Sequence, residues 1–303
     1  MYLTGFADEA ADSIEGQIEA TRALGWENIE ARSVNGKNIH DIPDAEFEKV
    51  FSKLEEAGIR INCFGSTLAN WGTPVDGPFE ETLAALERAI SRMKRCKTRL
   101  VRIMSYAVLH DAEGRALEDQ KEEERFRRLR EICRRFTDAG ITPVHENCHT
   151  YGGMGVAHAL RLLENVPGLK LVFDTGNPPL TPNFEKPFPY PVQDSWELYK
   201  AVRPHIAYVH IKDGFLRPAK GGRPAEEVYT FPGEGGGSVA KIVEDLLATG
   251  YDGGFSMEPH MAVVFHHAEV QSAVEARFSN YVEYGRRFIK LLAARGPAAK
   301  KSP

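Results

Sequence analysis

The 303-residue sequence has few cysteines and no long apolar runs. Its four cysteines are scattered and form no C-x-x-C pair, so the sequence predicts neither a disulfide framework nor a zinc knuckle. No apolar segment approaches the ~20 residues that a membrane-spanning helix needs. The N-terminus also has no basic stretch followed by an apolar run. We therefore expect a cytoplasmic protein with no membrane partner.

Positive charge is also in short supply. The chain has 38 Lys and Arg against 43 Asp and Glu, and its formal net charge is -5. Because nucleic-acid binding depends on neutralising phosphates with Lys and Arg, we expect no nucleic-acid partner. No G-x-G-x-x-G follows the first apolar run, which argues against a dinucleotide-binding fold. Hydrophobic residues make up 42% of the chain, enough for a sizeable core.

Short β-branched or apolar runs recur along the chain, and each is followed by a longer amphipathic stretch. The runs predicted to be strands are 3–7, 28–32, 60–65, 100–105, 142–146, 170–174, 207–211 and 254–257. The stretches predicted to be helices are 13–24, 44–57, 79–94, 122–139, 155–165, 195–202, 239–249 and 268–294. Gly25, Gly58, Gly140 and Gly250 each follow a helical pattern, where a left-handed cap favours a residue without Cβ.

The alternation of strands and helices determines the expected fold class. Strict alternation implies a parallel sheet with right-handed crossovers. Eight such units favour a closed α/β barrel over an open, doubly wound sheet, and a (β/α)8 or TIM barrel typically takes ~250 residues. We therefore predict one (β/α)8 barrel domain over residues 1–295, followed by a disordered C-terminal tail at 296–303.

The last four predicted strands each end with a side chain that can bind a metal ion: Glu146, Asp174, His210 and Glu258. One such residue alone is weak evidence, because a carboxylate at a strand end is often a helix cap or an ion-pair partner. Four on consecutive strands are more informative, since active sites of barrels form at the carboxyl ends of strands that lie ~5 Å apart. Three carboxylates and one imidazole form a hard ligand set that suits Mn²⁺ or Mg²⁺, with Co²⁺ or Zn²⁺ as alternatives.

These residues also carry a resemblance to a known family. Glu146, D-T-G from Asp174, H-I-K-D from His210 and E-P from Glu258 resemble the sugar phosphate isomerase/epimerase superfamily of xylose-isomerase-like barrels. That group includes ketose 3-epimerases, hydroxypyruvate isomerase and inosose dehydratase, and the resemblance covers roughly residues 3–292. It implies that the four residues bind one divalent metal ion, Mn²⁺ first. It also implies that Glu146 and Glu258 act as the acid/base pair, and that the protein is a homo-oligomer, a dimer or tetramer.

The expected function is that of a metal-dependent isomerase or epimerase of a sugar or keto-polyol. A metal ion that holds a carbonyl and a neighbouring hydroxyl acidifies the C–H between them, so that one carboxylate can remove the proton and the other return it. A lyase that expels a leaving group from the same enolate is the alternative, such as a keto-inositol dehydratase or a β-eliminase of 3-oxo-glycosides. A non-catalytic sugar-binding barrel would predict a lost ligand, and none is lost.

Five further residues are expected to bind the substrate: Lys212, His149, Asn177, Trp71 and Glu30. Lys212 lies two residues after His210 and therefore on the same face of the strand. Many members of the family carry a His where this chain has Asn177, and an amide cannot shuttle a proton, which keeps the lyase alternative open. Trp71 resembles the aromatic platforms that stack on sugar rings. The glycine-rich segment 231–238 precedes a helix and is a candidate phosphate loop.

Overall fold

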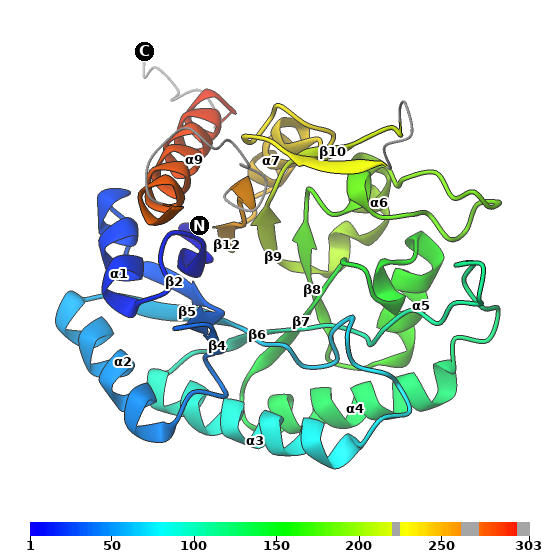
Figure 1. Cartoon of the computed structure of the whole chain (residues 1–303), viewed down its shortest axis with the longest axis horizontal. Coiled ribbons are helices and arrows are strands. Elements are labelled where there is room, and N and C mark those ends of the chain that lie inside the picture. The colour runs from blue at the N-terminus through cyan, green and yellow to red at the C-terminus, as the bar shows by residue number, and fades with distance from the viewer. Residues whose placement is uncertain (220–224, 262–272, 296–303) are drawn as a thin grey trace.

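Eight parallel strands form the barrel of this computed structural model, which describes residues 1–219, 225–261 and 273–295 (Figure 1). Their order around the barrel is β1-β12-β9-β8-β7-β6-β5-β2. A parallel bridge from Phe6 to Glu30 joins the two outer strands, so the barrel is nearly closed. The strands are β1 (Tyr2–Gly5), β2 (Asn28–Ala31), β5 (Arg60–Gly65), β6 (Leu100–Ile103), β7 (Thr142–Glu146), β8 (Lys170–Asp174), β9 (Ile206–Ile211) and β12 (Gly254–Met257). The predicted TIM-barrel fold is confirmed.

Helices surround the barrel, as Figure 1 shows. They are α1 (Ile14–Ala23), α2 (Asp44–Ala57), α3 (Phe79–Cys96), α4 (Glu122–Asp138), α5 (Val156–Asn165), α6 (Ser195–Val202), α7 (Val239–Ala248) and α9 (Ala273–Arg295). The four predicted cap glycines all have positive φ, from 70° to 80°. The predicted tail at 296–303 and residues 268–272 of the last predicted helix lie outside the described residues. None of the described helices has the length and apolarity to cross a membrane.

Two small hairpins extend the loops at the carboxyl ends of the strands. Strands β3 (Ser33–Val34) and β4 (Lys37–Asn38) pair after β2, and β10 (Gly214–Arg217) pairs with β11 (Glu226–Tyr229) after β9. Short 3-10 turns also follow several barrel strands: η1 (Ala7–Glu9), η2 (Tyr151–Gly153) and η3 (Pro178–Leu180), while η4 (Arg203–His205) precedes β9. The two hairpins and the turns η1, η2 and η3 border the end of the barrel where active sites form, whereas η4 lies at the opposite end.

The barrel interior is layered, because side chains two residues apart on a strand point to the same face. Val144, Val172 and Tyr208 are fully buried and pack together inside the barrel with Cys63. Two residues beyond the first three come Glu146, Asp174 and His210. The alternation of the strands therefore places a metal-capable side chain directly beyond an apolar or aromatic layer on each of three neighbouring strands.

Candidate metal centre

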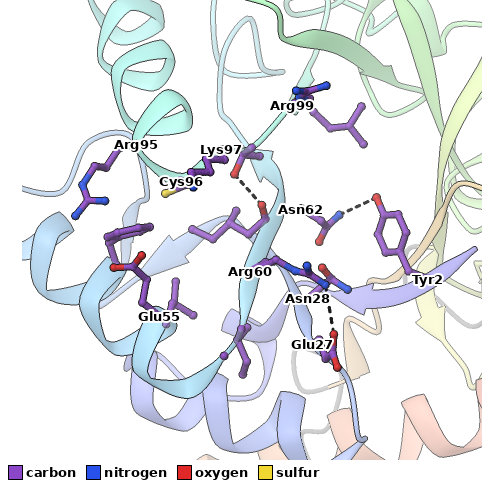
Figure 2. A pocket seen from close by; sticks show the side chains of 17 residues that line it. Tyr2, Glu27, Asn28, Glu55, Arg60, Asn62, Arg95, Cys96, Lys97 and Arg99 are labelled. Carbon is purple, nitrogen blue, oxygen red and sulfur yellow. Dashed lines mark hydrogen bonds and ion pairs between the residues drawn. The ribbon is translucent and has the colours of Figure 1, made fainter.

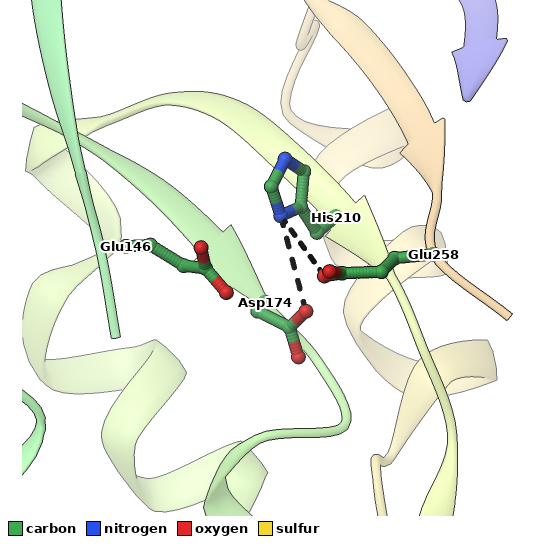
Figure 3. A group of neighbouring side chains, drawn as sticks. All are labelled: Glu146, Asp174, His210 and Glu258. Carbon is green, nitrogen blue, oxygen red and sulfur yellow. Dashed lines mark ion pairs between the residues drawn. The ribbon is translucent and has the colours of Figure 1, made fainter. Parts of the chain in front are cut away.

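The four predicted ligands converge at the carboxyl end of the barrel (Figure 3). Glu146 ends β7, Asp174 ends β8, His210 lies one residue before the end of β9, and Glu258 directly follows β12. Each offers one nitrogen or oxygen, and these atoms all lie within 4.8 Å of one another. No side chain of the four is more than 4% exposed. The structure thus brings together residues that are more than 100 positions apart in the sequence.

Two buried atoms of this group have no hydrogen-bond partner among the described residues: Asp174 Oδ2 and His210 Nδ1. The other carboxylate oxygen, Oδ1, accepts hydrogen bonds from the backbone N–H groups of Gly176 and Asn177, at 2.8 and 2.7 Å. His210 Nδ1 lies 3.5 Å from Glu258 Oε2 and 3.9 Å from Asp174 Oδ2. A buried polar atom without a partner costs about 1–3 kcal/mol. A cation between these atoms would remove that cost, so the residues present fit a hard divalent ion.

Three basic side chains surround the carboxylates. Arg102 Nη1 donates to Glu146 Oε2 at 2.9 Å, and Arg32 Nη1 donates to Glu258 Oε1 at 3.0 Å. Lys212 Nζ donates to Glu258 Oε2 at 3.1 Å. It lies equally close to Asp174 Oδ2, at 3.1 Å, but in an orientation that leaves Oδ2 without a hydrogen bond. The ammonium group therefore offsets part of the negative charge and leaves an acceptor free.

The carboxylates differ in proton affinity because burial and the surrounding cations balance differently at each. Burial would raise the pKa of Glu146, but the nearby cations, Arg102 first and then His210 and Lys212, together outweigh it, and the pKa lies below its ordinary value. The same balance, with Lys212 as the main cation, holds the pKa of Glu258 well below its ordinary value. For Asp174 burial prevails over the attraction of Lys212, and the pKa is raised to about 7. Glu146 and Glu258 are thus ionised at neutral pH, while Asp174 is near its midpoint.

Glu30 lies behind His210, on the side away from the other ligands. His210 Nε2 is 3.0 Å from Glu30 Oε2 and 3.2 Å from Oε1, and Tyr208 donates its hydroxyl to Oε2 at 2.9 Å. Burial would lower the pKa of His210, but the Glu30 carboxylate contributes most to raising it to about 10. Because a carboxylate only accepts, it keeps the proton on Nε2 and directs Nδ1 to the cluster. This placement favours an orienting role over the predicted contact with substrate.

The other predicted substrate residues divide into two groups. Lys212 and Asn177 are buried within the cluster, where the Asn177 amide donates to Glu146 Oε1 at 2.9 Å and so steadies a ligand. Gly176 is needed here, because a Cβ at this position would lie 2.7 Å from the backbone of Lys212. His149 and Trp71 are exposed in the loops beyond the cluster, where they line a small cavity.

Sequence reasoning missed Arg102 and His260. Arg102 is 3% exposed in the middle of β6, and a charged residue inside an otherwise apolar strand was the available signal. His260 Nδ1 lies 3.0 Å from Glu9 Oε1, and its Nε2 lies 3.5 Å from Glu258 Oε1. Nothing in the local sequence pairs His260 with Glu9, because the two residues are 251 positions apart.

The glycine-rich segment 231–238 has a partner within the chain. Asp213 accepts hydrogen bonds from the backbone N–H groups of Gly233, Gly235 and Gly237, at 2.8, 3.1 and 2.8 Å. A carboxylate thus takes the place that a phosphate would need, so the structure does not support the predicted phosphate loop. These hydrogen bonds instead connect the segment that precedes α7 to the chain that follows β9.

A large cavity lies at the opposite end of the barrel (Figure 2). Its volume is about 840 Å³, and it is lined by residues at the starts of strands, including Tyr2, Asn28, Arg60 and Leu100. Enzymes with this fold place their active sites at the carboxyl ends of the strands, and the amino end serves stability. The candidate site is therefore identified by its buried ligand residues and not by the volume of a cavity.

Comparison with known proteins agrees with this geometry. The family model for the xylose isomerase-like TIM barrel matches residues 18–280. A magnesium complex of a xylose isomerase-like TIM barrel protein from Mycobacterium smegmatis is 17% identical, with 96% of this chain and 97% of that chain covered and a TM-score of 0.66. At this level of identity the likeness shows the fold alone. No curated protein matches the sequence significantly.

Two enzymes of different classes share this fold as well. The probable 3-DHS dehydratase AsbF from Bacillus anthracis is 17% identical, with 93% of this chain and 97% of that chain covered and a TM-score of 0.64. A D-psicose 3-epimerase determined in the presence of D-fructose is 16% identical, with 96% and 99% covered and a TM-score of 0.65.

Proposed function

The chain belongs to the xylose isomerase-like TIM barrel family, and we propose that it is a divalent-metal-dependent isomerase or epimerase of a sugar or keto-polyol. One observation carries the proposal: three buried carboxylates and an imidazole converge at the carboxyl end of the barrel, and two of their atoms make no hydrogen bond among the described residues. The shared fold of a D-psicose 3-epimerase and an L-ribulose 3-epimerase supports this reaction class. Mn²⁺ is the proposed metal, with Mg²⁺, Co²⁺ and Zn²⁺ as alternatives.

Glu146, Asp174, His210 and Glu258 would hold the ion. When bound, such an ion polarises a carbonyl and acidifies the neighbouring C–H of a substrate. Glu146 and Glu258 approach the cluster from opposite sides in Figure 3. Because their pKa values lie below the ordinary range, each is ionised at neutral pH and acts as a weak base, which can take a proton only from an acidified C–H. We assign the proton removal to one of them and the proton return to the other, on the opposite face or the adjacent carbon.

Lys212 and Asn177 would support this transfer in different ways. The Lys212 ammonium is within 3.1 Å of both Asp174 and Glu258, where it can donate to a substrate oxygen and stabilise developing negative charge. The Asn177 amide donates a hydrogen bond to Glu146 Oε1 and so orients the Glu146 carboxylate.

A lyase that uses the same cluster is the second candidate, and Asn177 favours it. Many members of the family carry a His at this position, and an amide cannot shuttle a proton as an imidazole can, which weighs against a standard ketose 3-epimerase. The probable dehydratase with the same fold supports this alternative. Release of water or of an aglycone from the substrate would distinguish a lyase from an isomerase. A sugar-binding barrel without catalysis is the third reading, and it would show no exchange of solvent hydrogen into a bound sugar.

The decisive experiment is metal analysis of the wild-type protein and of Glu258→Gln after chelation and add-back. Glu27→Gln is a matched control, because Glu27 is an exposed carboxylate at the amino end of the barrel. We expect about one equivalent of metal in the wild type and the control, and a much weakened site in Glu258→Gln. Keto sugars incubated in heavy water should then exchange a carbon-bound hydrogen. If neither the wild type nor the Glu27→Gln control binds metal, the proposed function is wrong.

We further propose that the protein is a homo-oligomer, a dimer or tetramer, as the resemblance to its family implies. Light scattering after size-exclusion chromatography measures the mass directly, and a mass near 33.8 kDa would contradict this proposal.

A further inference from the structure

A second, smaller cavity lies at the same end of the barrel as the metal cluster. Its volume is about 210 Å³. Loops after β5, β6, β7 and β8 line it, and those after β7 and β8 directly follow two of the proposed ligands, Glu146 and Asp174. The side chains that define it, hereafter the aromatic cavity, are Trp71, His110, His149, Thr150, Thr181 and Phe184.

Short stretches of chain connect the aromatic cavity to the metal cluster. His149 follows Glu146 by three residues, so their Cα atoms are at most ~11 Å apart. Thr181 follows Asn177, which donates to Glu146, by four residues. Residues that line the aromatic cavity are therefore only three or four positions along the chain from residues of the metal cluster, at the same end of the barrel.

The walls of the aromatic cavity suit an uncharged ring. Among the described residues no Asp, Glu, Lys or Arg lines it, in contrast to the adjoining cluster. His149 exposes part of its side chain to solvent, but the loops packed around its ring desolvate it and hold the imidazole pKa below its ordinary value, so this imidazole is neutral at neutral pH. Trp71 is 59% exposed and thus leaves ring surface uncovered. Phe184 is held in place by His110 and Tyr190, with ring centroids 5.7 and 4.7 Å away.

One polar group in the wall lacks a partner. The Thr181 hydroxyl is buried and makes no hydrogen bond within the described part of the chain. Its oxygen has almost no accessible surface, so neighbouring atoms cover it and it is not open to a ligand in the cavity. The volume sets the ligand's size: a cavity of about 150 Å³ can hold benzene, so 210 Å³ accepts one six-membered ring with a small substituent.

We propose that the aromatic cavity is a subsite for one uncharged aromatic ring, attached to the sugar that occupies the metal cluster. The substrate would then be an aryl conjugate of a sugar that carries a carbonyl in its ring, as the proposed chemistry requires, and not a free monosaccharide. The aromatic ring would stack on Trp71. This inference rests on the proposed function, because it takes the sugar to lie at the cluster.

Binding can be tested without turnover. Saturation-transfer NMR would compare phenyl β-D-glucopyranoside with methyl β-D-glucopyranoside and with free phenol, on metal-loaded and on chelated protein. We expect the phenyl ring to receive the strongest saturation and the phenyl compound to bind on the order of tenfold more tightly than the methyl compound. Trp71→Ala should remove that difference. Phe215→Ala is the matched control, because Phe215 is an exposed aromatic on β10 that is not among the described residues lining the cavity.

The outcomes separate this proposal from the proposed function. If phenol binds the chelated protein and depends on Trp71, the subsite stands even when no metal-dependent chemistry is found. If the phenyl and methyl compounds bind equally, or if Trp71→Ala changes nothing, the subsite is wrong. Tighter binding of cellobiose than of the phenyl compound would also overturn it, because the second ring would then be a sugar.

Discussion

The two ends of the barrel both offer cavities and charged residues, but they hold charge in opposite ways. At the amino end, the cavity of about 840 Å³ has ion pairs such as Arg60–Glu27, whose side chains are 73% and 74% exposed. At the carboxyl end, the paired side chains of Arg102 and Glu146 are each 4% exposed. Exposed ion pairs contribute only about 0–1 kcal/mol, whereas burying carboxylates costs free energy that a stable fold would avoid without a reason.

Buried charged groups, and not the size of a cavity, mark the candidate functional site of this protein. The amino end has the larger cavity, yet its charges are satisfied by solvent and by neighbours. The carboxyl end has three buried carboxylates and two buried atoms without hydrogen-bond partners among the described residues. Clusters of buried titratable groups with perturbed pKa values are typical of functional sites. Substitutions at both ends of the barrel and a change of pH test whether the two ends differ in function.

The largest effect is expected for Asp174→Asn. It removes a carboxylate ligand, so metal affinity should fall by more than the roughly 100-fold that loss of a supporting residue causes. In the metal-free protein the same change should raise the melting temperature at pH 8, because it removes a buried carboxyl whose pKa is raised to about 7. Calorimetry of metal binding and of unfolding measures both. Equal metal affinity in the variant would contradict the site.

The second effect concerns pH. Metal binding needs ionised Asp174 and a free His210 Nδ1, and in the metal-free protein their pKa values are raised to about 7 and about 10. Both groups therefore hold protons below pH 7, and only His210 does between 7 and 10. We expect binding to release about two protons near pH 5.5 and about one near pH 8.5, with affinity rising with pH. Titration calorimetry in buffers of different ionisation enthalpy counts these protons. A count that does not change with pH would refute this assignment.

A smaller effect is expected for Glu30→Gln. The amide still accepts a hydrogen bond from His210 Nε2 but has no negative charge, so the imidazole becomes a weaker ligand. We expect a loss of about 10- to 100-fold in metal affinity. Tyr208→Phe, which removes only one hydrogen bond to Glu30, should lose less. If Glu30→Gln binds metal like the wild type while Glu30→Ala unfolds, Glu30 has a structural role only.

The smallest effect is expected at the amino end. Arg60→Ala breaks an exposed ion pair with Glu27, so the free energy of unfolding should change by no more than about 1 kcal/mol. Metal affinity and activity should remain those of the wild type. Denaturant unfolding and metal titration test this together. A large loss of activity would mean that the cavity in Figure 2 takes part in function, and the contrast between the two ends would fail.

Much of the site was predictable because it follows strand periodicity. Four of the eight strands begin and end where predicted, including β7 and β8, which carry Glu146 and Asp174. Alternate residues of a strand share a face. A metal-capable residue two positions after a residue of the barrel interior therefore also points into the barrel. The predicted roles of Lys212, His149, Asn177 and Trp71 in substrate binding stay predictions, because the structure shows where these side chains lie and not what they bind.

The sequence by itself determined the barrel and the four strand-end residues, because both depend on patterns within a few positions of each residue. Tertiary structure alone decided which partners those residues have. Arg102 reaches Glu146 from 44 positions away, and Glu30 reaches His210 from 180 positions away. The aromatic cavity likewise joins loops from four strands. Closure of the barrel creates these contacts, and no local pattern records which side chains on its strands will meet.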